Sequence, residues 1–294
     1  MKKNFAARSF DAIMTGVPTV IYVFFILLPC IVGLFVSLTD FGGYSLDLKY
    51  VGLYHYTKMF SDPVFYKSVW NYMALYVGTV LICFPLALSF AIILTRNRIK
   101  ERNFYRVLFF FPSTVPLMII SLMWMVVYNP NFGILNQFLG LFGVPGQAWL
   151  GTKDTVMWAI IVMLVWRQFG FYLVFFMAGV NNIPRDLYES AKIDGAGEIR
   201  QTFSITIPLM WEVVRSSLVF YVQTACNVGF NIVYITTRGG PDNASQLLSS
   251  YMYQSITEQL DYGYASALGT ALLIITTVLA LVILRSTKRE VHQF

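Results

Sequence analysis

Charged residues are scarce in this chain: 12% of its 294 residues are charged and 57% are hydrophobic. A soluble domain of this length needs a polar surface, so the composition excludes an ordinary soluble protein. Only two histidines occur, His55 and His292, and they are far apart in the sequence. They offer no metal-ligand spacing and no Ser–His–Asp arrangement, so the sequence predicts no catalytic residue and no metal ligand.

Cysteines and buried carboxylates are also few. Cys30, Cys83 and Cys226 lie within apolar segments without CxxC spacing, which indicates buried free thiols. The 15 acidic residues fall in tails, loops or the ends of apolar segments. A secondary transporter or channel usually needs carboxylates or a cation site within the membrane. This distribution of acidic residues argues against a secondary transporter, which remains the alternative hypothesis from a different class of protein.

The most prominent feature present is a set of long apolar segments. A helix of about 20 residues crosses roughly 30 Å of hydrocarbon, and the segments lack the alternation of barrel strands. The sequence therefore predicts an all-α transmembrane chain with one domain, residues 1–294. Six spans are expected, at about 13–38, 69–94, 107–128, 156–180, 211–236 and 264–284.

Local signals modify this pattern. Pro29, Pro85, Pro112 and Pro116 fall within the apolar segments and predict kinked helices, two of them in the third segment. Between the third and fourth segments, Ile134 to Phe142 is apolar enough to form a short helix on the membrane surface.

The positive charges predict the orientation. The net charge of +6 is compatible with nucleic acid, but its distribution indicates topology instead. With the N-terminus in the cytoplasm, fifteen of the 21 basic residues face inward: Lys2, Lys3, Arg8, Arg96, Arg98, Lys100, Arg102, Arg106, Arg185, Lys192, Arg200, Arg215, Arg285, Lys288 and Arg289. Five face outward (Lys49, Lys58, Lys67, Lys153 and Arg238), and Arg167 lies within a span. The same orientation puts the C-terminus in the cytoplasm.

A polar island, Ile183 to Leu209, separates the fourth and fifth segments on the predicted cytoplasmic side. Pro184 suits the start of a helix over Arg185 to Ile193, and Gly195 permits a turn with positive φ at its end. A second helical piece is expected over Glu198 to Phe203, with Pro208 opening the fifth span. The residue types alone fit equally an amphipathic loop lying on lipid headgroups.

The spacing within this island is more specific. Glu189 is followed by Ser190 and Ala191, then by Gly195, and after nine intervening residues by Ile205-Thr206-Ile207-Pro208. This order resembles the signature loop by which permeases of ATP-binding-cassette (ABC) importers grip their ATPase. The segments Tyr50–Tyr72 and Tyr234–Leu268 are similar to carbohydrate-importing, MalF-like permeases, the first of the two unlike permeases in such systems.

The resemblance implies a six-helix type I ABC importer permease with a cytoplasmic coupling helix. The implied ATPase-coupling residues are Asp186, Leu187, Tyr188, Glu189, Ser190, Ala191, Asp194 and Gly195. The implied partners in a bacterial cytoplasmic membrane are a second homologous permease forming a heterodimer, an ATPase dimer and an extracellular solute-binding protein. ATP and Mg²⁺ would bind the ATPase, with no cofactor on this chain. The implied substrate is an oligosaccharide or related sugar, or alternatively glycerol phosphate or an acidic sugar.

Polar residues within the spans predict a substrate path. Gln223, Asn227 and Asn231 recur at four-residue intervals with Tyr234 continuing the face, and amides can hold sugar hydroxyls weakly. Hydrogen bonding to a partner helix is the alternative.

The fourth segment adds Arg167, Gln168 and Tyr172 to this predicted path. Arg167 lies too deep to reach an interface, and its guanidinium suits an acidic sugar or a phosphate. It equally suits the partner permease or helix-end carbonyls.

Overall fold

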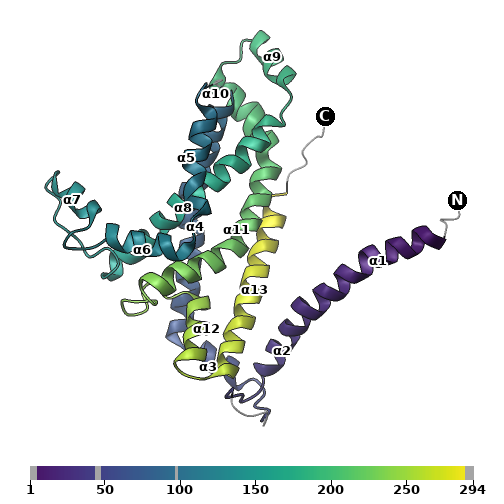
Figure 1. Ribbon diagram of the computed structural model, residues 1–294, viewed down its shortest axis with the longest axis vertical. Coiled ribbons are helices and arrows are strands. Elements are labelled where there is room, and N and C mark those ends of the chain that lie inside the picture. Colours follow the sequence, from purple (N-terminus) through teal and green to yellow (C-terminus); the bar gives the residue numbers. More distant parts are fainter. Residues whose placement is uncertain (1–4, 44–47, 97–98, 289–294) are drawn as a thin grey trace. The chain divides into compact units, whose positions relative to one another are not determined.

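The computed structural model describes residues 5–43, 48–96 and 99–288, which are largely helical (Figure 1). Lys2, Lys3, Arg98 and Arg289, which contribute to the predicted charge bias, lie outside these residues. The chain divides into two compact units, Met1–Asp62 with Tyr251–Leu273, and Pro63–Ser250 with Ile274–Phe294. Helices α12 (Leu248–Thr257) and α13 (Tyr262–Ser286) contribute residues to both units.

The first unit begins with one helical stretch made of α1 (Phe5–Tyr22), the π-helix η1 (Val23–Leu27) and α2 (Leu28–Val36). The part Ile13–Val36 is long and apolar enough to span a membrane. Pro29 lies just after the π-turn, and it has no N–H to donate to the preceding turn. The N–H of Leu28 bonds to the carbonyl of Val23, five residues back, so the wider turn keeps the helix continuous around the proline.

A polar network fastens the short helix α3 (Tyr54–Phe60) in this unit. Lys58 Nζ lies 2.7 Å from Asp261 Oδ2, just before α13 begins. Asp62 Oδ2 accepts hydrogen bonds from the hydroxyls of Tyr251 at 2.5 Å and Tyr264 at 2.6 Å. The two carboxylates therefore link the chain after the first span to both sides of the α12–α13 turn.

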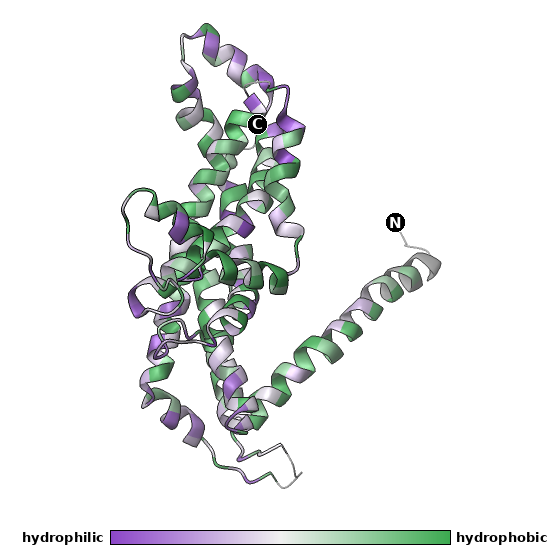
Figure 2. Ribbon diagram, turned by 60° about the vertical axis from the view of Figure 1, so that its left-hand side comes forward, coloured by the Kyte–Doolittle hydropathy of each residue, from purple (hydrophilic) through white to green (hydrophobic). Residues whose placement is uncertain are grey.

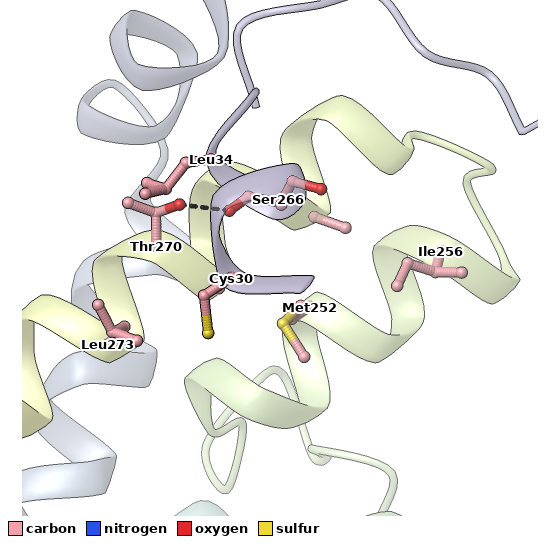
Figure 3. Close-up of a pocket in the computed structure, with 10 residues that line it drawn as sticks. Cys30, Leu34, Met252, Ile256, Ser266, Thr270 and Leu273 are labelled. Atoms are coloured by element: carbon pink, nitrogen blue, oxygen red, sulfur yellow. Dashed lines mark hydrogen bonds between the residues drawn. The ribbon is translucent and has the colours of Figure 1, made fainter. Parts of the chain in front are cut away.

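A groove of about 280 Å³ lies between α2, α12 and the first half of α13, all within the first unit (Figure 3). A Cβ on Gly269 would lie 3.1 Å from Met252 Sδ, so the small residue allows α12 and α13 to approach closely. The hydroxyl of Thr270 donates to the carbonyl of Ser266 at 2.9 Å, which satisfies it within its own helix (Figure 3). The remaining lining is mainly apolar: Cys30, Gly33, Leu34, Ile256, Ala265 and Leu273.

The second unit is a helical bundle made of α4 (Pro63–Arg96), α5 (Arg102–Thr114), α6 (Leu117–Val127), α7 (Ile134–Gly140), α8 (Lys153–Asn181) and α11 (Ile207–Thr236). Helices α4, α5 and α11 pack on α8 (Figure 1). Gly170 lies where α5 crosses α8, and a Cβ there would be 1.7 Å from the carbonyl oxygen of Phe109. The crossing depends on the missing side chain, because backbone atoms cannot rotate out of the way.

Tyrosine hydroxyls connect the helices of this bundle. Tyr72 donates to the carbonyl of Val222 at 2.8 Å and Tyr76 to that of Leu218 at 3.1 Å, which joins α4 to α11. Tyr128 donates to the carbonyl of Ala159 at 3.1 Å, just after α6. Each bond satisfies a hydroxyl that would otherwise be buried without a partner in an apolar interior.

All six predicted apolar segments form helix, with one substantial difference. Five helical stretches are long and apolar enough to span a membrane, and a sixth arises only if α5 and α6 together form a broken span. These two helices are bent by 97°. Val115 and Pro116 are extended between them, with ψ of 135° and 137°, because a residue before proline avoids helical backbone. The predicted helix over 134–142 is observed as α7, which ends at Gly140.

Candidate functional site

The polar loop Ile183–Leu209 contains the predicted first helix with the predicted bounds, α9 (Arg185–Ile193). Pro184 immediately precedes it with ψ of 135°, so it acts as the N-terminal cap residue. Asp186 lies in the first turn and Lys192 in the last, which complements the helix dipole at both ends.

Gly195 terminates α9 in the left-handed conformation, with φ of +78°. The N–H of Ala196 bonds to the carbonyl of Ala191 at 2.8 Å, and that of Gly195 to Lys192 at 3.1 Å. This pair of bonds is a Schellman motif, which satisfies the last carbonyls of the helix. The loop therefore has a defined turn rather than a flexible link.

The second helical piece is continuous with the following span, which corrects the expectation that Pro208 opens a new helix. Helix α10 (Glu198–Gln201) passes through the π-helix η2 (Thr202–Thr206) directly into α11. As in η1, the wider turn lies just before a proline that cannot donate an N–H. Periodicity in the sequence gives no signal for such a turn.

Arg96, the last residue of α4, fastens this loop to the bundle. Its guanidinium donates to Gln201 Oε1 and to Thr202 Oγ1, and it lies 4.4 Å from the centre of the Tyr188 ring. Tyr188 in turn shares a hydrogen bond of 3.0 Å with Thr206 Oγ1. Both helical pieces of the loop are therefore held against the end of α4.

The loop presents an outer surface that is polar with exposed apolar residues. In Figure 2, α9 and the chain around it are markedly more hydrophilic than the long helices of the same unit. Three large side chains are nevertheless exposed, Ile193 at 87%, Ile199 at 77% and Phe203 at 67%. Five of the predicted coupling residues are exposed: Asp186, Glu189, Ser190, Asp194 and Gly195. The other three are partly buried: Leu187, Tyr188 and Ala191. Exposed apolar side chains amid charges are typical of a docking surface.

The predicted amide stripe (Gln223, Asn227 and Asn231) follows one face of α11. Gln223 and Asn227 are exposed and Asn231 is partly buried. Asn231 Nδ2 donates to the carbonyl of Asn227 at 2.9 Å and lies 3.2 Å from its side-chain oxygen. Tyr234 stacks on Phe230 with ring centres 5.7 Å apart. The four residues lie together as the helical period requires.

The structure places three aromatic side chains beside this stripe that the sequence interpretation missed, here named the aromatic face: Phe171, Phe175 and Phe220. Phe171 is stacked with Phe175 and with Phe220, at 6.5 and 6.0 Å between centres. Together with Tyr172, Ser216 and Ser217 they line a pocket of about 320 Å³ between α8 and α11. Phe220 precedes Gln223 by one helical turn, so this spacing could have predicted that Phe220 lies on the same face of α11 as the amide stripe.

The three predicted path residues of α8 differ in how deeply they are buried. Tyr172 is 1% exposed and packs on Phe84 at 4.5 Å between ring centres. Gln168 is buried and accepts a hydrogen bond of 3.2 Å from Arg167 Nη1. Arg167 is partly buried and forms no ion pair with the residues that the structure describes.

At the opposite end of the second unit, the loop after α11 is held by several polar contacts. Lys153 Nζ lies 2.6 Å from Asp242 Oδ2, and Lys67 donates to the Asp242 carbonyl at 2.8 Å. Asn71 donates to the carbonyl of Gln246 at 2.9 Å. Arg238, Gly239, Asp242 and Asn243 all have positive φ. The side chains from α4 and α8 thus fix an unusually folded loop.

This ion pair predicts a pH dependence. The pKa of Asp242 is lowered because Lys153 donates a hydrogen bond to it and carries a positive charge. The stabilisation is present above the ordinary aspartate pKa of about 3.9. It is lost as the pH falls through the lowered pKa of the folded state. Thermal unfolding of wild type and Lys153→Met in detergent should therefore differ most at neutral pH and converge in acid.

Lys49→Met is the matched control, since Lys49 is another exposed lysine without an ion pair among the described residues. A Lys153→Met difference that persists unchanged in acid would contradict the assignment.

The arrangement of the helices matches solved transporters. A bacterial ABC transporter involved in the import of the acidic polysaccharide alginate contains a chain that superposes with a TM-score of 0.81 at 21% identity, covering 96% of each chain. The fold is that of a type I ABC importer permease.

Sequence comparison gives the family. Residues 84–289 match the family described as binding-protein-dependent transport system inner membrane component, and the chain belongs to it. It is 36% identical to the diacetylchitobiose uptake system permease protein NgcF of Streptomyces coelicolor, over 95% of this chain and 82% of the relative. It is 34% identical to the trehalose/maltose transport system permease protein MalF of Thermococcus litoralis, over 90% and 86%.

Family membership establishes a transport permease and a multi-pass protein of the cytoplasmic membrane. Permeases of this family work with a second permease, an ATPase and a substrate-binding protein.

Proposed function

We propose that this chain moves an oligosaccharide or related sugar through the membrane and is driven through the loop Ile183–Leu209 by a separate ATPase. The observation that carries the proposal is the geometry of that loop, a rigid helix–turn–helix with exposed apolar residues, joined at both ends to long apolar helices. The uptake systems named for NgcF and MalF support a carbohydrate substrate.

The proposed orientation puts this loop and both termini in the cytoplasm, as the charge bias predicts. The coupling surface would then comprise the exposed residues Asp186, Glu189, Ser190, Asp194 and Gly195, with Leu187, Tyr188 and Ala191 supporting them from the inner side. ATP and Mg²⁺ belong to the ATPase in this proposal. The second permease is a homologous but different chain, and the solute-binding protein docks from outside.

The proposed substrate path combines the amide stripe with the aromatic face. Sugars present hydroxyls at their edges and C–H groups on their faces, so amides and flat rings can contact the two kinds of surface. Phe220 and Gln223 are one helical turn apart on α11, and Phe171 stacks on Phe220 from α8. Buried Tyr172 would support this face from behind. Arg167 and Gln168 would contribute to the proposed path from α8.

Uptake measured in proteoliposomes containing the complete transporter tests the path. Asn227→Leu should raise the KM for sugar uptake about tenfold, the effect of losing roughly one hydrogen bond of 1.4 kcal/mol. Asn227→Gln keeps the amide and should restore most of the affinity. Equal KM values for Leu and Gln variants would remove Asn227 from the path and favour a helix–helix contact.

The charge of the substrate is the second question. An acidic sugar or glycerol phosphate would give Arg167 a partner for its guanidinium. Diacetylchitobiose and maltose carry no net charge, which favours a neutral oligosaccharide. Substrate-stimulated ATP hydrolysis by the Arg167→Gln transporter distinguishes a neutral from an anionic substrate. It is measured once with a neutral ligand and once with an acidic ligand on the binding protein. Loss of stimulation with the acidic ligand alone supports an anionic substrate.

A further inference from the structure

A polar cleft of about 490 Å³ lies between the loop Ile183–Leu209 and the bundle, wholly within the second unit. It opens between α9, α10 and the ends of α4, α5 and α8, and it shares Tyr188 and Glu189 with the predicted coupling residues. Its lining includes Thr95, Arg102, Arg185, Glu189, Lys192 and Glu198. The proposed coupling function does not account for a cavity on this inner side.

The charge of the cleft favours an anion. Four cations line it against two carboxylates, Glu189 and Glu198. Arg96 is engaged by Gln201, Thr202 and the Tyr188 ring, as described above. In contrast, Arg102, Arg185 and Lys192 form no ion pair within the described part of the chain. Three basic groups from two different helices thus converge without a carboxylate partner.

A buried hydroxyl adds to this arrangement. Thr95 Oγ1 is buried and has no hydrogen-bond partner among the described residues. Leaving a buried donor unsatisfied is unfavourable. An anion with several oxygen atoms in the cleft would accept from this hydroxyl and from the basic groups simultaneously.

The position of the cleft favours a lipid over a soluble anion. Arg96 ends the apolar helix α4, and Arg102 begins α5. The first turns of α5 expose Phe104 and Val107, each at 64%. Arginines beside exposed apolar side chains are typical of the membrane interface, and basic pockets at the cytoplasmic ends of membrane helices suit anionic headgroups.

We propose that this cleft binds the phosphate of an anionic phospholipid from the inner leaflet, with Arg102, Lys192 and Thr95 as its principal contacts. The lipid would brace the inner side of the coupling loop, while the exposed side faces the ATPase. The proposal rests on the cytoplasmic orientation proposed above for this loop.

Native mass spectrometry of the assembled transporter in detergent tests this site, with phosphatidylglycerol and phosphatidylcholine as probes. Wild type should retain phosphatidylglycerol in preference to phosphatidylcholine. Arg102→Gln should weaken phosphatidylglycerol binding about fivefold, the factor expected for one basic residue at an anionic surface. Lys192→Gln should weaken it similarly. Arg106→Gln is the matched control, because Arg106 is exposed one turn further along α5 and does not line the cleft.

Four results would overturn the proposal. They are equal retention of the two lipids, unchanged binding in Arg102→Gln, displacement of the lipid by inorganic phosphate alone, and lipid binding only after the ATPase has been stripped away. The third would assign the cleft to a soluble anion, and the fourth to a side chain of the ATPase. The amount of lipid retained by the transporter in detergent does not depend on which side of the membrane the loop faces. A failure of the proposed orientation would instead appear as labelling of Ser190→Cys from outside intact cells.

Discussion

Replacement of Gly195 by valine should lower sugar uptake about tenfold or more while leaving ligand capture by the solute-binding protein intact. Gly195 has φ of +78°, and a side chain in the left-handed region costs about 1–2 kcal/mol, with branched side chains at the upper end. That cost shifts the turn about tenfold away from its observed conformation. Uptake and substrate-stimulated ATP hydrolysis in proteoliposomes should fall together by about this factor or more.

Gly197→Val is the matched control, since Gly197 lies in the same loop with an ordinary φ of −67°. A Cβ at either position meets nothing within 4 Å, so the comparison isolates backbone conformation from crowding. Glu189→Lys reverses a charge on α9 without altering the turn at Gly195 and should also uncouple uptake. Normal uptake in both Gly195→Val and Glu189→Lys would contradict the coupling assignment.

Gly170→Ala should have the largest effect on folding. The added methyl would lie 1.7 Å from the carbonyl oxygen of Phe109 and 2.6 Å from the backbone nitrogen of Phe110. Helices α5 and α8 must separate to admit it, and we expect a loss of at least about 3 kcal/mol, the upper part of the range for overpacked interiors. A strongly lowered thermal unfolding midpoint of the full chain in detergent, with little folded protein recovered, is the expected result.

Gly140→Ala provides the comparison, because this glycine ends α7 and its Cβ would meet nothing within 4 Å. It should unfold like wild type. Equal stability of Gly170→Ala and Gly140→Ala would show that α5 does not cross α8 as closely as the structure indicates.

Local chemistry made the polar loop predictable. Proline before α9, complementary charges at its two ends and glycine after it are all short-range signals, and α9 has the predicted bounds. Apolar length likewise predicted where the long helices lie. The prolines of the third segment predicted a kink, but the 97° angle depends on how α5 and α6 pack against the rest of the bundle.

The phase of the apolar helices was harder to predict. Helix α8 is hydrophobic all round, so its sequence does not show that Tyr172 is buried while Phe175 is exposed. The amide stripe on α11 could be predicted from the sequence because polar residues are rare in that segment and recur with the helical period. The cleft behind the loop joins side chains about 100 residues apart, and only the folded chain brings them together.

The absence of a break at Pro208 has a mechanical consequence. One helical stretch runs without a break from Glu198 to Thr236, 39 residues. The coupling loop and the amides of α11 therefore share one hydrogen-bonded backbone, and no non-helical joint separates them. A displacement of α10 is passed to the amide-bearing helix through the backbone itself.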